Sequence, residues 1–176
     1  MQTGVPYGYR PRHSLCVLRE FTRFCLYCQQ KACAFFTARS GAVSARERGF
    51  AVSGGYVRIL LSNDDGIHSP CLRALHRALC DAGHTLDVVA PLVEQSGVGC
   101  SVTLHSPLRL HPVKEEGFSG TAVTGTPVDC VKIALTTLLP TPPDLVVVGI
   151  NNGANKGVDV FYSGTVGAAT LLIKTR

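Results

Sequence analysis

A regular succession of apolar and polar segments begins near residue 57 and predicts two strands joined by a helix. Val57 to Ser62 is a short apolar run typical of a buried strand. We expect a helix next, with Ser69 as its N-cap residue, a proline at its first position and an end near Gly83. Its apolar face recurs at intervals of three and four residues: Leu72, Leu75, His76 and Leu79. Thr85 to Pro91 is the second strand, so a right-handed βαβ unit with parallel strands is the simplest interpretation.

The remaining pattern continues this α/β arrangement. Alternation within residues 101–112 predicts an exposed, extended excursion, and residues 127–139 combine helical apolar spacing with a proline at the start. The run 144–149 is apolar and β-branched, as in a buried parallel strand. A final helix is predicted from Gly164 toward Lys174. The class that follows is α/β with a mostly parallel sheet.

Residues 1–56 show no sustained period, and we assign no element to them; Gly54 and Gly55 mark the boundary. This segment holds eight of the 17 basic residues and two of the 12 acidic ones, a net charge of +6, whereas the rest carries −1. A nucleic-acid patch therefore belongs only to this segment, and we expect no stable nucleic-acid binding. The segment is a translation artefact, a targeting-like leader or a real appendage; we expect disorder or an artefact.

Hydrophobic residues make up 45% of the 176 residues, which is enough for a buried core. The apolar runs are far shorter than the ~20 residues that span a membrane. Cysteines scattered singly after residue 56 are typical of a reduced, cytoplasmic protein. Cys25, Cys28 and Cys33 have spacing that suits zinc, but a second paired ligand set is missing.

Oxygen-rich side chains follow three of the predicted strands. The segments are Asn63 to Gly66, Glu94 to Gly97 and Asn151 to Asn155. Ligands collect at the carboxyl ends of strands in open α/β sheets. Adjacent carboxylates such as Asp64 and Asp65 repel each other unless a cation lies beside them, and Mg²⁺ and Mn²⁺ prefer oxygen ligands.

Each of these segments also has an ordinary interpretation. One aspartate could be a solvated loop residue and the other a helix cap, since Asp-Asp-Gly is common in turns. Ser96 alone is typical of a loop, and Asn151 and Asn155 could be metal ligands, turn residues or both.

Hydroxyl groups also lie at the predicted start of the last helix. Ser163 to Thr165 could bind a phosphate through the helix N-terminus or act as an ordinary cap. Cys130 lies in predicted helix core and is interpreted as structural. His68 is the histidine placed to help the acidic loop, whereas His76 is expected to pack on its helix. Three others are expected at the surface or an edge: His84, His105 and His111.

Five motifs, in order and in register, resemble the SurE family of 5'(3')-nucleotidases. The likeness covers about residues 57–169 and is more specific than any single motif. The motifs are Arg58 to Ile67, Val89 to Gly97, Gly125 to Cys130, Gly149 to Asn155 and Tyr162 to Val166.

The resemblance implies a Rossmann-like three-layer sandwich, incomplete at the C-terminus, with residues 57–176 as the N-terminal portion of the phosphatase domain. It implies one divalent cation, Mg²⁺ or Mn²⁺. By position, its ligands are Asp64, Asp65, Ser96 and Asn151, with the two aspartates also as catalytic residues. By the same correspondence, the phosphate and substrate side consists of Asn63, Asn155, Ser163, Gly164 and Thr165.

The implied function is hydrolysis of nucleoside 5'- and 3'-monophosphates, with short polyphosphate as a further substrate. Both water and an aspartate stay open as the nucleophile. Full-length family members form dimers or tetramers. The sequence departs from the family pattern at Leu92 and in the helix after Ala168. A catalytically inactive nucleotide-binding or metal-binding fragment is the alternative.

Overall fold

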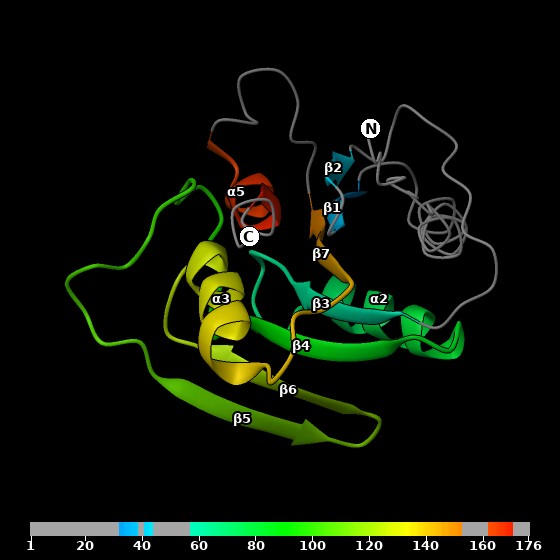
Figure 1. The fold of residues 1–176 in the computed structure, drawn as a ribbon. Helices are drawn as coiled ribbons and strands as arrows, with labels where there is room; N and C mark the ends of the chain where they lie inside the picture. The colour runs from blue at the N-terminus through cyan, green and yellow to red at the C-terminus, as the bar shows by residue number, and fades with distance from the viewer. Residues whose placement is uncertain (1–31, 39–40, 44–56, 153–161, 171–176) are drawn as a thin grey trace, which may run out of the picture.

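A seven-stranded sheet is the centre of the structure, a computed structural model that describes residues 32–38, 41–43, 57–152 and 162–170. The strand order is β2-β1-β7-β3-β4-β6-β5 (Figure 1). The strands are β1 (Ala32–Ala38), β2 (Gly41–Val43), β3 (Arg58–Ser62), β4 (Thr85–Pro91), β5 (Leu110–Glu115), β6 (Phe118–Val123) and β7 (Leu145–Asn152). The helical elements are α2 (Pro70–Asp81), α3 (Pro127–Ile133), the π-helical turn η1 (Ala134–Leu138) and α5 (Gly164–Thr170).

The middle of the sheet is parallel, as predicted. Strand β3 pairs in parallel with β4 on one side and with β7 on the other, and β4 pairs in parallel with β6. In the registers of these pairs, Leu61 lies opposite Val88 in β4 and opposite Val147 in β7. The carboxyl ends of β7, β3 and β4 therefore meet at one edge of the sheet.

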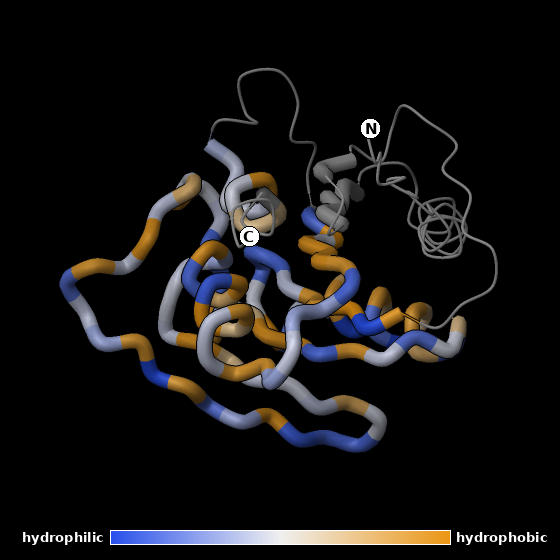
Figure 2. The backbone as a smooth tube through the Cα atoms, viewed as in Figure 1, coloured by the Kyte–Doolittle hydropathy of each residue, from blue (hydrophilic) through white to orange (hydrophobic). Residues whose placement is uncertain are grey.

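Helices cover both faces of the sheet. Because successive side chains of a strand point to opposite faces, Ile59 and Leu61 join one core and Leu60 joins the other. The first core includes the buried face of α2, and the second includes residues of α3 and α5 (Figure 1). The arrangement confirms the expected Rossmann-like α/β fold with three layers. Figure 2 shows hydrophobic stretches in the middle of the molecule and others along the outer connection at the left of the view.

The ends of the elements agree with the sequence analysis in most places. Helix α2 has the expected proline in its first turn, but the Ser69 side chain makes no capping hydrogen bond. Helix α3 has a full capping box between Thr126 and Asp129, and its last predicted turn is the π-helical η1. The predicted excursion overlaps the structure's β5–β6 hairpin only at the start of β5, and this hairpin was not assigned from the sequence.

The edge of the sheet beside β7 also differs from the expectation. Strands β1 and β2 lie within the segment to which no element was assigned, and β1 pairs antiparallel with β7. This ladder runs through the pair Ala32 and Asn152, so β7 extends three residues past its predicted end at Gly149. The predicted domain boundary near residue 56 stays a prediction, and the proposed zinc ligands Cys25 and Cys28 lie outside the described residues.

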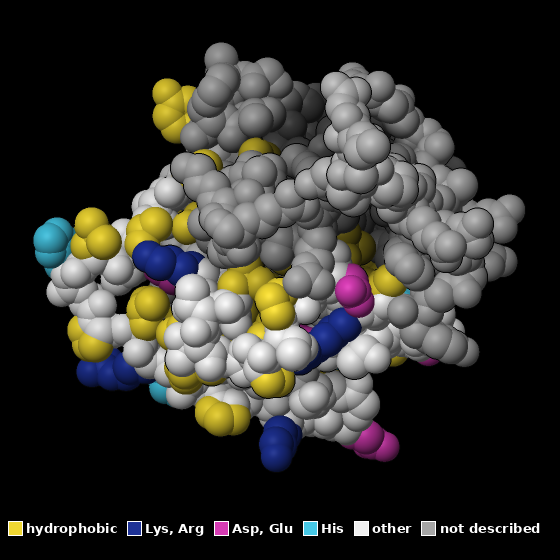
Figure 3. Space-filling view, viewed as in Figure 1, with side chains coloured by type: hydrophobic (Ala, Val, Ile, Leu, Met, Phe, Trp, Pro, Cys, Tyr) yellow, Lys and Arg dark blue, Asp and Glu magenta, His cyan; other side chains and the backbone are white. Residues whose placement is uncertain are grey.

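An 18-residue connection, residues 92–109, leads from β4 to β5 around the outside of α3 (Figure 1). Several large exposed hydrophobic side chains lie on it or next to it: Val93, Val98, Val102, Leu104 and Leu110. On the face drawn in Figure 3, hydrophobic side chains along this side of the molecule are interspersed with polar ones. The described helices include none long and apolar enough to cross a membrane.

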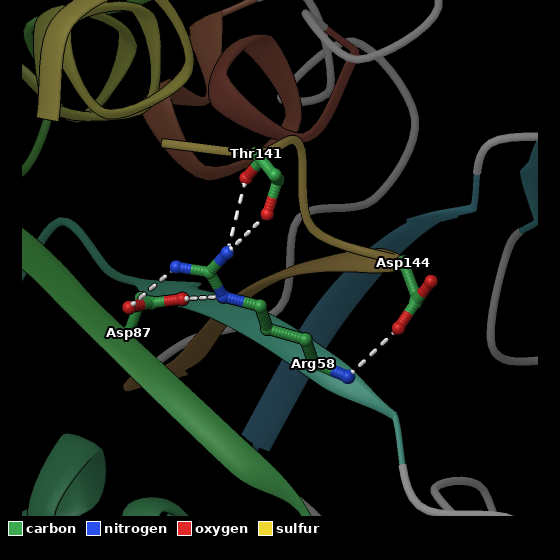
Figure 4. A network of polar contacts seen from close by, with 4 residues as sticks. All are labelled: Arg58, Asp87, Thr141 and Asp144. Carbon is green, nitrogen blue, oxygen red and sulfur yellow. Dashed lines mark hydrogen bonds and ion pairs between the residues drawn. The ribbon is translucent and has the colours of Figure 1, made fainter. Parts of the chain in front are cut away.

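Arg58, at the start of β3, connects three segments (Figure 4). Its Nε donates to Asp87 Oδ2 on β4 at 2.7 Å, and its Nη1 donates to Thr141 Oγ1 at 2.6 Å. Its backbone N donates to Asp144 Oδ2 at 2.9 Å, just before β7. The three central strands are thereby joined at the end of the sheet opposite the strand exits that carry the candidate ligands.

Replacement of Arg58 by Met should lower the free energy of unfolding by about 1–2 kcal/mol, because the ion pair and the bonds to Thr141 are only partly shielded from water. Urea unfolding followed by circular dichroism measures the change. Arg77→Met, at an exposed position on α2, is the matched control and should change stability by much less. Equal losses in the two variants would contradict the importance of the Arg58 network.

Candidate active site

The predicted ligand segments lie at the ends of adjacent strands. The loop with Asp64 and Asp65 follows β3, the segment with Ser96 follows β4, and Asn151 belongs to the last residues of β7. Strand β3 lies between the other two in the sheet. The topology therefore places these three segments at one edge, as the sequence analysis expected.

Asp64 does not behave as an ordinary turn residue. Only 6% of its surface is exposed, and Asp65 is half-buried. Helix α2 begins at Pro70 with Ser69 at its N-cap position, so neither aspartate caps the helix. The ordinary interpretation of the Asp-Asp-Gly sequence, a solvated loop residue beside a helix cap, is therefore wrong for this loop.

Backbone hydrogen bonds hold the Asp64 loop against the segment after β4. The Gln95 N–H donates to the Asp64 carbonyl at 2.7 Å, and the Ile67 N–H donates to the Pro91 carbonyl at 2.8 Å. Gly66 lies between these contacts with φ of 95°. A Cβ at Gly66 would lie 3.3 Å from the Val93 carbonyl carbon, so the positive φ and the close approach both favour glycine.

Burial raises the pKa of Asp64 above its ordinary value, and the nearby charge of Glu94 adds to this effect. The Thr165 hydroxyl acts in the opposite direction and lowers the pKa by hydrogen bonding. This hydroxyl is itself buried and makes no hydrogen bond of ordinary geometry among the described residues, so the interaction is a loose one. A loop after β3 and the first turn of α5 therefore face each other.

Two further buried oxygen atoms at this edge have no hydrogen-bond partner among the described residues: Ser62 Oγ and Asn63 Oδ1. The Asn63 side chain uses its other end, because Nδ2 donates to the Gly66 carbonyl at 3.2 Å. Buried polar atoms are normally paired, so unpaired oxygen atoms on the residues next to a buried aspartate suit a hard cation or its water ligands. The part of the chain that is described contains no group of three or more His, Cys, Asp and Glu residues placed to hold a metal. The set inferred from the sequence is different, with two carboxylates, a hydroxyl and an amide.

In the first turn of α5, the structure shows the ordinary cap expected of the Ser163 segment, and phosphate binding there stays a prediction. Ser163 Oγ accepts a hydrogen bond from the Val166 N–H at 3.2 Å, which is ordinary capping. Thr165 is fully buried and faces Asp64, as its effect on the pKa shows. A Cβ on Gly164 would lie 3.3 Å from the Gly99 carbonyl oxygen, so the segment after β4 also packs on this turn.

The other predicted ligands are less closely tied to Asp64. Ser96 is exposed, but it follows Gln95, whose N–H binds the Asp64 carbonyl. Asn151 is half-buried and lies within β7, not in the loop that was expected to contain it, because β1 extends the ladder there. Asn155 lies outside the described residues.

Two residues near Asp64 were not singled out from the sequence. Glu94 stood in an oxygen-rich segment and lies near enough to affect the pKa of Asp64. Ser62 is the last residue of β3 and is fully buried. The sequence feature that could have identified Ser62 is a polar residue at the end of an apolar strand. The same feature is equally typical of an ordinary strand end.

Cys130 is fully buried in the α3 core, and burial raises the pKa of its thiol far above the ordinary value, which fits the structural interpretation. His76 packs against Phe118, as expected for its helix, with ring centroids 4.8 Å apart. His84 was expected at the surface or an edge, but it is 7% exposed and lies directly before β4. His68 contacts Arg73 on α2, with 3.3 Å between Nδ1 and Nη2.

Comparison with known proteins supports this assignment of motifs. The model of the family described as survival protein SurE matches residues 59–172. A 5'-nucleotidase SurE of Maridesulfovibrio salexigens is 61% identical over 114 residues, which are 65% of this chain and 45% of that protein. A protein of the same name from Syntrophobacter fumaroxidans is 55% identical over 115 residues, or 65% of this chain and 46% of that protein. The chain thus spans less than half the length of these relatives.

A solved structure shares the fold as well as the sequence. The crystal structure of the SurE protein from Aquifex aeolicus has a TM-score of 0.57 and 43% sequence identity, covering 64% of this chain and 45% of that chain. The family model covers more than half of the 176 residues and includes the strand ends after β3, β4 and β7. The chain therefore belongs to the SurE family.

Proposed function

We propose that this protein is a divalent-cation-dependent phosphomonoester hydrolase that removes phosphate from nucleoside 5'-monophosphates, and from 3'-monophosphates as well. The observation that carries the proposal is the buried Asp64 carboxylate at the exit of the central strand, where the neighbouring residues Ser62 and Asn63 have buried side-chain oxygen atoms without a hydrogen-bond partner among the described residues. The relatives named 5'-nucleotidase SurE support the choice of nucleotides as substrates.

Four residues would hold the cation: Asp64, Asp65, Ser96 and Asn151. Their oxygen donors favour Mg²⁺ or Mn²⁺ over softer metals. When bound, such a cation supplies Lewis acidity toward a phosphoryl oxygen and lowers the pKa of bound water. Burial raises the pKa of Asp64, and a neighbouring cation would favour its ionised form.

The substrate phosphate would lie between the Asp64 loop and the first turn of α5. Thr165 faces Asp64 there, and its hydroxyl makes no ordinary hydrogen bond among the described residues, so it could donate to a phosphoryl oxygen. Ser163 and Gly164 would contribute the backbone of the turn, and Asn63 would contribute its side-chain amide N–H groups, one of which donates to the Gly66 carbonyl in this structure. Asn155 completes the set by position in the family motif.

The test is phosphate release from a panel of nucleoside 5'- and 3'-monophosphates by the full chain. Release that depends on added Mn²⁺ or Mg²⁺ and stops with a chelator is the expected result. Inorganic triphosphate in the same assay tests polyphosphate as a further substrate. Turnover that a chelator leaves unchanged, or turnover of no nucleotide, would refute the proposal.

The alternative function is that of a binding module, which would bind a nucleotide and a cation at the same strand ends without turnover. Equilibrium binding of a fluorescent nucleoside monophosphate in the presence of Mn²⁺, measured beside the phosphate assay, separates the two functions. Binding without phosphate release would identify a binding module.

A further inference from the structure

Arg73, on α2, makes a set of contacts that the proposed reaction has not used. Its Nε donates to the Ile67 carbonyl at 3.0 Å, at the end of the loop that contains Asp64 and Asp65. Its Nη1 and Nη2 donate to the two carboxylate oxygens of Glu115 on β5, at 2.7 and 3.1 Å. One guanidinium group therefore links the aspartate loop to a distant strand.

One face of the Arg73 guanidinium group packs on an aromatic ring. Its central carbon lies 3.4 Å from the centroid of the Phe118 ring, a cation–π contact. Glu115 and Phe118 are cross-strand partners that close the β5–β6 hairpin. Glu115 and Phe118, on either side of the hairpin turn, thus orient the Arg73 guanidinium group. The Arg73 side chain is only 19% exposed.

Ile67 transmits this constraint to the aspartates. Its side chain is fully buried in the core, its N–H binds the Pro91 carbonyl, and its carbonyl accepts the Arg73 bond. Asp65 is separated from Ile67 only by Gly66, whose lack of a side chain leaves the backbone free to adopt other conformations. A fixed Ile67 therefore restricts the conformations that the loop can adopt next to the glycine.

We propose that Arg73 is a positioning residue for the cation ligands Asp64 and Asp65, acting through the Ile67 carbonyl. The inference rests on the proposed function. The contact requires arginine because three nitrogen atoms in a planar fork reach Ile67 and Glu115 together, whereas a lysine ammonium cannot span both partners in the same geometry.

Mn²⁺ binding to the full-length variants tests the proposal without any dependence on turnover, with free Mn²⁺ measured by electron paramagnetic resonance. Arg73→Met should raise the Kd for Mn²⁺ roughly tenfold, the usual size of an effect from a residue behind the metal ligands. Arg73→Lys should resemble Met more than wild type. Arg77→Met, one turn further on the same helix and exposed, should bind Mn²⁺ as wild type does.

Kinetics separate positioning from general stability. In Arg73→Met, the Mn²⁺ concentration for half-maximal activity should rise, while kcat at saturating Mn²⁺ stays close to that of wild type. If Arg73→Met does not fold, Glu115→Gln removes the charged anchor at a half-exposed position and should raise the Kd about threefold. Glu116→Gln, in the adjacent turn, is its matched control.

The outcomes distinguish the two proposals. If the wild-type chain binds Mn²⁺ and folded Arg73→Met binds it with the same Kd, the role of Arg73 is overturned and the metal site stands. If Arg73→Met does not fold, an unchanged Kd in Glu115→Gln has the same meaning. Absence of Mn²⁺ binding by the wild-type chain would overturn the proposed metal site and the role of Arg73 with it.

Discussion

Replacement of Asp64 by Asn should reduce cation-dependent phosphate release by at least about a hundredfold, because the loss of residues behind a metal ligand already costs 10–100-fold. Asp64 is 6% exposed and follows Ser62 and Asn63, whose buried side-chain oxygens have no partner among the described residues. An amide of the same shape keeps the packing but removes the negative charge. Phosphate release from a nucleoside monophosphate at saturating Mn²⁺ measures the change.

Asp81→Asn is the matched control for this experiment. Asp81 is the exposed last residue of α2, so the same chemical change there should leave turnover unaltered. Circular dichroism of both variants confirms that they are folded. Substantial turnover by Asp64→Asn would show that Asp64 is not a ligand of a required cation.

Replacement of Asp129 by Ala should lower the free energy of unfolding by about 3 kcal/mol, because it leaves buried donors without an acceptor. Asp129 is 1% exposed and accepts hydrogen bonds from the backbone and hydroxyl of both Thr103 and Thr126. It thereby caps α3 and ties the long connection after β4 to that helix. Urea unfolding of the variant and the wild type measures the loss.

The stabilisation by Asp129 should also depend on pH. Burial alone would raise the pKa of this carboxyl, but the hydrogen bonds from Thr103 and Thr126 outweigh it and lower the pKa. The stabilisation is therefore complete above the ordinary aspartate pKa of about 4 and is lost as the pH falls through the lower pKa of the folded state. The stability difference between wild type and Asp129→Ala should shrink below about pH 4. A difference that is constant with pH would contradict this account.

Elements with a strong local pattern were predicted well from the sequence. Strand β4 has the predicted bounds, and α2 begins at the predicted proline. Strand β4 ends in a continuous buried run, and the buried residues of α2 recur at the helical period, so both patterns are visible in the local sequence. The β5–β6 hairpin was missed because such a pattern is absent from β5, which has no buried residue.

Pairing between segments that are distant in the chain could not be predicted from the local sequence. The pairing of β1 with β7 extends β7 to Asn152 and so places Asn151 inside a strand. A π-helical turn after α3 and the burial of His84 are likewise results of packing. The β1–β7 pairing depends on a partner more than 100 residues away, which no short window of sequence contains.

The sequence by itself determined the α/β class, the family and the succession of acidic and polar segments at the ends of three strands, because periodicity and motif spacing are local properties. Only the tertiary structure decided which of these side chains are buried together. It placed Thr165 opposite Asp64 and removed the aspartates from the helix cap. It also showed that Arg73, an ordinary helix residue in the sequence, contacts both the aspartate loop and Glu115, which is 42 residues further along the chain. Such contacts form only when the sheet brings distant segments to one edge, since their energy depends on burial and geometry and not on neighbours in the chain.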